Sequence, residues 1–107
     1  MKVTLAQINT TNGDLAGNTR KIIQAIDKAR SEGSDLVVFP EVATHGYTSQ
    51  DWFQDADIID HSLDPLREII PQTKGITAVI GTVRPNEDAA GRRLFNCAAV
   101  VHDGELL

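Results

Sequence analysis

The first forty residues of the 107-residue chain change their hydrophobic period twice, and this change most restricts what the chain can fold into. Residues 3–8 form a short apolar run of β-forming side chains, followed by a turn signal at 9–13. Apolar side chains then recur at helical spacing over 18–32, and residues 36–39 are again a short apolar run. Strand, helix and strand in this order predict a βαβ unit, in which a right-handed crossover joins two adjacent parallel strands.

Three residues mark where these elements are expected to end. Asn18 is a plausible N-cap for the helix, because a short polar side chain can accept the free N–H groups of the first turn. Gly33 is suited to the left-handed conformation that commonly ends a helix. Pro40 has no N–H and therefore ends the ladder of the second strand.

The rest of the chain predicts one more helix and further strands. Residues 41–54 lack a clean period and are expected to form a loop with a short helical turn. Helical spacing returns over 62–72, with Ser62 as a candidate cap and Pro65 in the permissive first turn. The remaining expectations are a strand at 76–83, an exposed turn at 84–93, a strand at 94–102, a hairpin turn at Asp103-Gly104 and a returning strand at 105–107. The fold class is therefore α/β with a mixed sheet, about four main strands and two helices.

Charge and composition exclude several classes of protein. Ten Lys and Arg residues against fifteen Asp and Glu, with a net charge of −5 and no basic run, exclude a nucleic-acid-binding surface. No apolar stretch approaches the ~20 residues that cross a bilayer, and the first residues turn polar too early for a signal peptide. The single cysteine, Cys97, excludes an internal disulfide and suits a reducing compartment. We therefore expect a cytoplasmic protein that binds neither nucleic acid nor membrane.

Glu41 is the most informative candidate for chemistry. It follows the second predicted strand through Pro40, and so it is expected at the carboxyl end of the sheet, where open α/β folds place their sites. Desolvation there would raise the pKa of the carboxyl and make it a usable general base near neutral pH. The alternative is a partly solvated loop carboxylate without a function.

Six segments in order along nearly the whole chain resemble one known family. They are Ala6-Gln7-Ile8-Asn9, Gly13-Asp14-Leu15-Ala16-Gly17-Asn18, Asp35-Leu36-Val37-Val38-Phe39-Pro40-Glu41, Gly46-Tyr47 with Asp51, Leu94-Phe95-Asn96-Cys97-Ala98-Ala99, and Asp103-Gly104. The strand followed by Phe-Pro-Glu resembles the opening of the nitrilase (carbon–nitrogen hydrolase) superfamily. The Gly-Asp-Leu-Ala-Gly-Asn and Gly-Tyr…Asp segments resemble, within it, the glutaminase domain of glutamine-dependent NAD synthetases.

This resemblance implies the first half of a nitrilase-type α-β-β-α sandwich, with the helices on one face of a mixed sheet. Residues 1–107 would be the N-terminal part of a carbon–nitrogen hydrolase (glutamine amidotransferase) domain, truncated before its end. In the family a cysteine thiolate attacks the side-chain amide of glutamine, a glutamate is the general base and a lysine stabilises the oxyanion. The ammonia released passes to a synthetase domain that uses ATP and Mg²⁺ to amidate nicotinic acid adenine dinucleotide. The resemblance also implies a homo-oligomer.

Residue by residue, Glu41 matches the family's general base and Tyr47 matches a tyrosine that lines the glutamine pocket. The lysine and the nucleophilic cysteine would follow beyond residue 107, so the segment alone is expected to be inactive. Cys97 lies mid-strand in Phe-Asn-Cys-Ala-Ala-Val-Val, whereas the family's nucleophile lies at a strand-to-helix elbow. A strand cysteine is usually an inert, small apolar residue, so we expect Cys97 to be structural.

The other polar and aromatic residues predict no metal or cofactor site in this segment. His45, His61 and His102 lack metal-ligand spacing, although His45 is near enough to Glu41 to contact a pocket. Gly13 and Gly17 fit turn geometry better than a phosphate loop. The remaining candidates are Asp51, Asp55, Asp57 and Asp60, expected on a solvated face, and Trp52 and Phe53, expected in packing or an interface.

Three other functions remain open from the sequence. The first is another member of the superfamily, such as an amidase, nitrilase or carbamoylase with a different amide substrate. The second is a nucleotide-binding α/β module that uses the loop at 13–17. The third is a non-catalytic interaction module.

Overall fold

The computed structural model describes residues 1–46, 60–85 and 94–107, and in these ranges it contains one mixed sheet with the strand order β1-β2-β3-β4-β5. The elements in chain order are β1 (Val3–Leu5), α1 (Leu15–Ser31), β2 (Leu36–Val38), α3 (Asp64–Ile69), the 3₁₀ turn η2 (Ile70–Gln72), β3 (Thr77–Pro85), β4 (Leu94–His102) and β5 (Glu105–Leu106). Strands β1, β2 and β3 are parallel, whereas β4 and β5 pair antiparallel. The predicted βαβ unit is confirmed, because β1 and β2 are parallel neighbours joined through α1.

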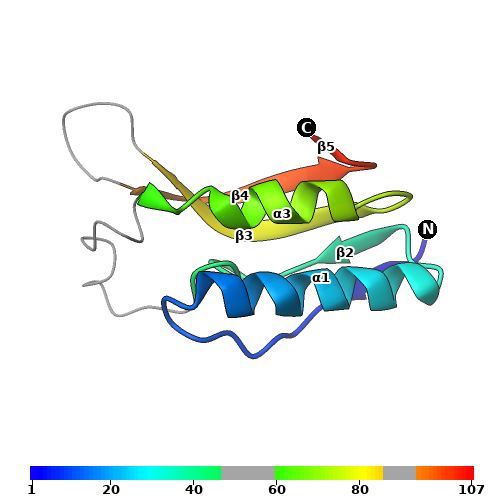
Figure 1. The fold of residues 1–107 in the computed structure, drawn as a ribbon. Helices are drawn as coiled ribbons and strands as arrows, with labels where there is room; N and C mark the ends of the chain where they lie inside the picture. The colour runs from blue at the N-terminus through cyan, green and yellow to red at the C-terminus, as the bar shows by residue number, and fades with distance from the viewer. Residues whose placement is uncertain (47–59, 86–93) are drawn as a thin grey trace.

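The two helices of the described residues, α1 and α3, lie on the same face of the sheet, as the sequence predicts (Figure 1). The core between the helices and the sheet consists of apolar side chains that are almost completely buried. It comprises Ile22, Ile26, Ala29, Val37, Phe39, Ala43, Ile69, Ile76, Ala78, Ile80 and Val101. Side chains alternate between the two faces along each strand, so the strand residues next to these buried ones point to the opposite face of the sheet.

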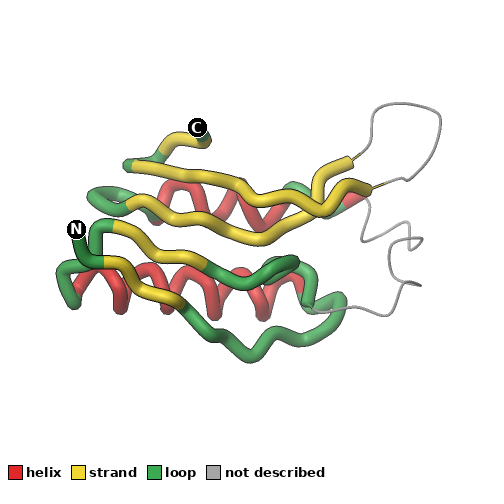
Figure 2. The backbone as a smooth tube through the Cα atoms, turned by 180° about the vertical axis from the view of Figure 1, so that it is seen from behind, coloured by secondary structure: helices red, strands yellow, loops and turns green. Residues whose placement is uncertain are grey.

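That opposite side, here called the open face, is not covered by any helix of the described residues (Figure 2). It carries a row of apolar residues in register across four strands, namely Leu5, Val38, Val79 and Val100. Leu5 is 75% exposed and Val100 is 36% exposed. An apolar face of this kind is what one half of a two-sheet sandwich presents to the other half.

Helix α1 begins earlier than its sequence pattern predicts. Asp14 is the N-cap, and its carboxylate accepts the N–H of Gly17 at 2.9 Å. The prediction of Asn18 as the cap is therefore wrong, because Asn18 lies inside the first turn and is completely buried. The predicted stop is confirmed, since Gly33 has a φ of 82° and its N–H bonds to the carbonyl of Arg30.

The second helix is shorter than predicted at both ends. Its N-cap is Leu63 without a side-chain bond, so the prediction of Ser62 as the cap is wrong, and Ser62 is instead buried. Pro65 lies in the first turn, as predicted. After Ile69 the chain tightens into a 3₁₀ turn, because Pro71 has no N–H to continue the α-helical ladder.

The strand ends differ from the sequence pattern by a few residues. β1 stops at Leu5 and β2 at Val38, each earlier than expected. β3 continues through Arg84 and Pro85, so the prediction that the exposed turn begins at 84 is wrong, and residues 86–93 of that turn lie outside the described residues. The Asp103-Gly104 hairpin is confirmed: both residues have positive φ, of 48° and 83°, as a type I′ turn requires.

Candidate active site

The candidate site lies at the carboxyl end of β2, where the chain leaves the sheet. Phe39 extends the ladder by one bond, from its N–H to the carbonyl of Val79 at 2.9 Å, and its side chain is buried. Pro40 then ends the strand, and Glu41 follows at the first position of a turn over residues 41–45. The place that the sequence predicts for Glu41 is therefore confirmed.

The turn that carries Glu41 closes on itself and on the neighbouring strand. The N–H groups of His45 and Gly46 both bond to the carbonyl of Val42, at 3.0 and 2.8 Å. Val42 has a φ of 47°, which is rare for a β-branched residue. Thr44 donates its N–H to the carbonyl of Gly81 in β3 at 3.2 Å. The turn is thus fixed to the sheet by its own backbone.

Gly81 allows this close approach between the turn and the sheet. A Cβ atom at Gly81 would lie 2.1 Å from the carbonyl oxygen of Pro40 and 2.6 Å from the nitrogen of Val42. Separations this short do not occur between real Cβ atoms and the backbone. The absence of a side chain at Gly81 therefore allows the backbone beside Glu41 to lie directly against β3.

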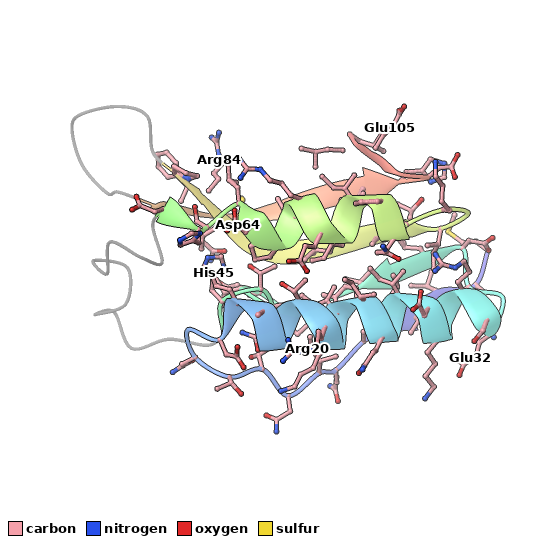
Figure 3. All side chains as sticks on the ribbon, in the orientation of Figure 1. Arg20, Glu32, His45, Asp64, Arg84 and Glu105 are labelled. Atoms are coloured by element: carbon pink, nitrogen blue, oxygen red, sulfur yellow. The ribbon has the colours of Figure 1, made fainter. Side chains whose placement is uncertain are left out.

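The turn and β3 share a buried polar cluster. It consists of Thr44, His45 and Thr82, all of which are 0% exposed. Oγ1 of Thr44 lies 2.5 Å from Nδ1 of His45 and 2.8 Å from Oγ1 of Thr82. Burial lowers the pKa of His45 to about 4, so its ring is neutral near pH 7. Figure 3 shows His45 between the beginnings of α1 and α3, where the chain folds back over the core.

Asn18 ties the same turn to the start of α1. Its Oδ1 accepts the N–H of Thr11 at 2.8 Å, and its Nδ2 donates to the carbonyls of Thr11 at 2.8 Å and Thr44 at 3.2 Å. The carbonyl of His45 also accepts the N–H of Gly13 at 2.9 Å. The loop after β1 and the turn after β2 are thus held together by polar contacts, which explains why Asn18 is buried inside the helix.

The carboxylate of Glu41 has a partner on a distant strand. Nδ2 of Asn96, in β4, donates a hydrogen bond to Oε1 of Glu41. Both side chains are exposed. The burial of Glu41 that the sequence led us to expect is therefore not found, because its side chain is exposed among the residues that the structure describes.

Cys97 lies in the middle of β4, opposite Thr82 on β3, and is half-buried. Burial raises the pKa of the Cys97 thiol, and the positive charge of Arg84 offsets part of that rise. A thiol in this state is mostly protonated near pH 7 and is a weak nucleophile. The mid-strand position and the raised pKa both agree with the structural role predicted for Cys97.

The structure also bears on the other candidate residues. Within the described ranges, no three His, Cys, Asp or Glu residues gather closely enough to hold a metal ion. At the 13–17 loop the Asp14 carboxylate already accepts the N–H of Gly17, which disfavours a second anion such as a phosphate. Neither described helix is long and apolar enough to span a membrane. Tyr47 and the segment from Asp51 to Asp57, with Trp52 and Phe53, lie outside the described residues.

Sequence reasoning did not identify Asn96, Thr44 or Thr82 as parts of this site. The Phe-Asn-Cys segment is one of those that resemble the family, but nothing in its spacing indicates that Asn96 reaches a residue 55 positions earlier. The two threonines have no pattern of their own, since a threonine in or beside a strand is ordinary.

Comparison with known proteins shows which family this chain resembles. The family model for carbon–nitrogen hydrolases matches residues 2–107. The chain is 39% identical, over 109 aligned residues, to a glutamine-dependent NAD(+) synthetase of Thermotoga maritima, covering all of this chain and 18% of that protein. The chain therefore spans about a fifth of the length of the curated relatives it matches.

Solved structures show the same fold. A glutamine-dependent NAD(+) synthetase from Cytophaga hutchinsonii superposes with a TM-score of 0.85 at 23% identity, covering 97% of this chain and 17% of that one. An amidase from Nesterenkonia sp. also superposes with a TM-score of 0.85, at 20% identity, covering 100% of this chain and 40% of that one. The nitrilase-type α/β fold predicted from the sequence, with a mixed sheet and helices on one face, is confirmed. The chain belongs to the carbon–nitrogen hydrolase family.

Proposed function

We propose that residues 1–107 are the N-terminal part of the glutaminase domain of a glutamine-dependent NAD synthetase. The observation that carries this proposal is the position of Glu41 on a fixed turn at the carboxyl end of β2. The 39% identity to the Thermotoga maritima synthetase, over the whole chain, supports this branch of the family. In the whole protein, Glu41 would act as the general base and Tyr47 would line the glutamine pocket.

The chemistry requires groups from other parts of the protein. A cysteine thiol there gives its proton to Glu41, and the thiolate attacks the side-chain carbonyl carbon of glutamine. A lysine stabilises the tetrahedral oxyanion while Glu41 returns the proton to the leaving nitrogen, so that ammonia departs and a γ-glutamyl thioester remains. Glu41 then takes a proton from water, which hydrolyses the thioester to glutamate and regenerates the thiol.

The ammonia would be used by a synthetase domain of the same chain. That domain would bind ATP and Mg²⁺ and amidate nicotinic acid adenine dinucleotide. We propose no metal or cofactor for the 107 residues themselves. A cytoplasmic homo-oligomer is also part of this proposal.

The test is ammonia release from glutamine by the full-length protein, measured with a coupled assay for ammonia. We expect turnover by the wild type, a loss of about 10²–10⁴-fold in Glu41→Gln, and none from the isolated 107-residue chain. NAD formation from nicotinic acid adenine dinucleotide, ATP, Mg²⁺ and glutamine tests the second half of the proposal. Full activity of Glu41→Gln would refute the role given to Glu41.

A second candidate is an amidase with another amide substrate. The fold supports it equally, because the Nesterenkonia amidase and the Cytophaga hutchinsonii synthetase superpose with the same TM-score. A panel of glutamine, asparagine and short aliphatic amides separates the two. A preference for the aliphatic amides by at least 10-fold in kcat/KM would favour the amidase.

A further inference from the structure

We propose that Asn96 is a positioning residue, which orients the carboxylate of Glu41 for proton transfer. The inference rests on the proposed function of Glu41 as a general base. Its basis is the hydrogen bond that Nδ2 of Asn96, in β4, donates to Oε1 of Glu41, in the turn after β2. Asn96 does not contact the reacting atoms in this scheme and acts only through Glu41.

The register of the sheet brings the two residues together. Asn96 in β4 pairs with Val83 in β3, two residues beyond Gly81, and the Glu41 turn lies directly on Gly81. Side chains alternate along β4, so Asn96 lies on the open face while the neighbouring Cys97 faces the helix side. The amide of Asn96 therefore projects from the same face over which Glu41 extends.

The backbone of Glu41 is already fixed, so its side chain is the part that still needs orienting. The bond from the N–H of Thr44 to the carbonyl of Gly81 and the Thr44–Thr82 pair hold the turn on β3. Neither contact restricts the three side-chain torsions of Glu41. The bond from Asn96 restricts them, because it fixes one carboxylate oxygen relative to the sheet.

The chemistry of an amide suits this task. A primary amide donates a hydrogen bond without a charge and without titrating near neutral pH. With Oε1 held by the amide, Oε2 is the oxygen presented for the proton of the nucleophile. A misplacement of about 1 Å in a reacting group can cost about 10²-fold in rate, so holding the carboxylate is worth a measurable factor.

The rival explanation is an ordinary surface hydrogen bond, since both side chains are exposed. Such a bond contributes about 0.5–1.5 kcal/mol to stability at most and does not affect the reaction. The two explanations differ in one respect. A bond that acts through Glu41 loses its effect on rate when Glu41 is itself replaced.

The experiment uses the full-length protein with Asn96→Ala, Asn96→Asp, Glu41→Gln and the two double variants. Asn96→Asp keeps the shape of the side chain and replaces the donating NH₂ by oxygen. Val100→Ala, on the same strand and the same face, is the matched control. Single-turnover release of ammonia from glutamine gives the rates, and steady-state assays give kcat and KM.

We expect both Asn96 variants to lower kcat by at least 10-fold with KM within about twofold, and Val100→Ala to leave kcat unchanged. In the Glu41→Gln background, replacing Asn96 should lower the rate by less than twofold, because the two residues act as one unit. A loss of less than twofold from Asn96→Ala alone, or equal losses in both backgrounds, would overturn the proposal.

Failure of the proposed function gives a different result. If the wild type hydrolyses another amide and not glutamine, the same ratios are measured on that amide and still decide the role of Asn96. Crystal structures of full-length wild type and Asn96→Ala add a readout that needs no activity. We expect the Glu41 carboxylate to leave its wild-type position in the variant, and an unmoved carboxylate would overturn the proposal.

Discussion

Replacing Gly81 by alanine should displace the turn that carries Glu41. The new Cβ would lie 2.1 Å from the carbonyl oxygen of Pro40, whereas ordinary contact begins at 3.4 Å. Because both atoms of this contact are fixed to backbone, the turn has to move away from β3 by about 1 Å, which is enough to lower kcat by about 10²-fold. Crowding a packed site in this way should also lower the free energy of unfolding by about 1–3 kcal/mol.

The assay is the ammonia release from glutamine that the proposed function predicts for the full-length protein, together with its thermal melting temperature. Gly33→Ala is the control, because Gly33 also sits in a special conformation, with a φ of +82° and no atom within 4 Å of the new Cβ. We expect Gly33→Ala to lower the melting temperature by a similar amount, since backbone strain of about 1–2 kcal/mol is introduced, while kcat stays unchanged. Wild-type kcat in correctly folded Gly81→Ala would refute the argument that close packing on Gly81 positions Glu41.

Three further predictions concern Thr82, His45 and Cys97. Thr82→Val removes a hydroxyl that Thr44 contacts at 2.8 Å, and it should lower the free energy of unfolding, measured in urea, by about 1–3 kcal/mol. Thr77→Val is the control: it removes a hydroxyl from an exposed pair with His102 and should lower the free energy of unfolding by clearly less. Burial lowers the pKa of His45 from 6.5 to about 4, so unfolding takes up a proton between these pH values. The contribution of His45 to the free energy of unfolding should therefore be constant above about pH 6.5 and fall by about 3 kcal/mol as the pH drops toward 4. In His45→Gln, the melting temperature should depend less on pH over this range. Cys97→Ala should leave kcat for glutamine within twofold of wild type, and abolished turnover would show that Cys97 is the nucleophile after all.

The fold was largely predictable because its signals are local. The change from a strand period to a helix period and back predicts the βαβ unit, and Gly33 marks the end of α1 through its own backbone preference. The start of α1 was not predictable in the same way. Asp14 and Asn18 are both good capping residues, and tertiary contacts decide between them, because Asn18 is needed to hold Thr11 and Thr44 together.

The candidate site was predictable only in part. A carboxylate directly after a buried strand and Pro40 locates Glu41 at the edge of the sheet, because the end of a parallel strand is a local feature. The exposure of Glu41 was not predictable, since burial depends on what covers the open face. The partner Asn96 lies 55 residues away in the sequence, and its place depends on the register between β3 and β4.

The antiparallel direction of β4 explains why such a distant residue reaches the site. β2 and β3 run parallel and end at the same edge of the sheet, so a parallel β4 would bring only its last residues there. Because β4 runs the other way, its beginning, with Asn96 opposite Val83, lies at that edge instead. A slip of one residue in this register would turn Asn96 toward the helices and bring Cys97 to the open face. The pairing of β3 with β4 therefore sets which polar side chain meets Glu41, and the proposed chemistry of the site depends on strand register as much as on the residue at position 41.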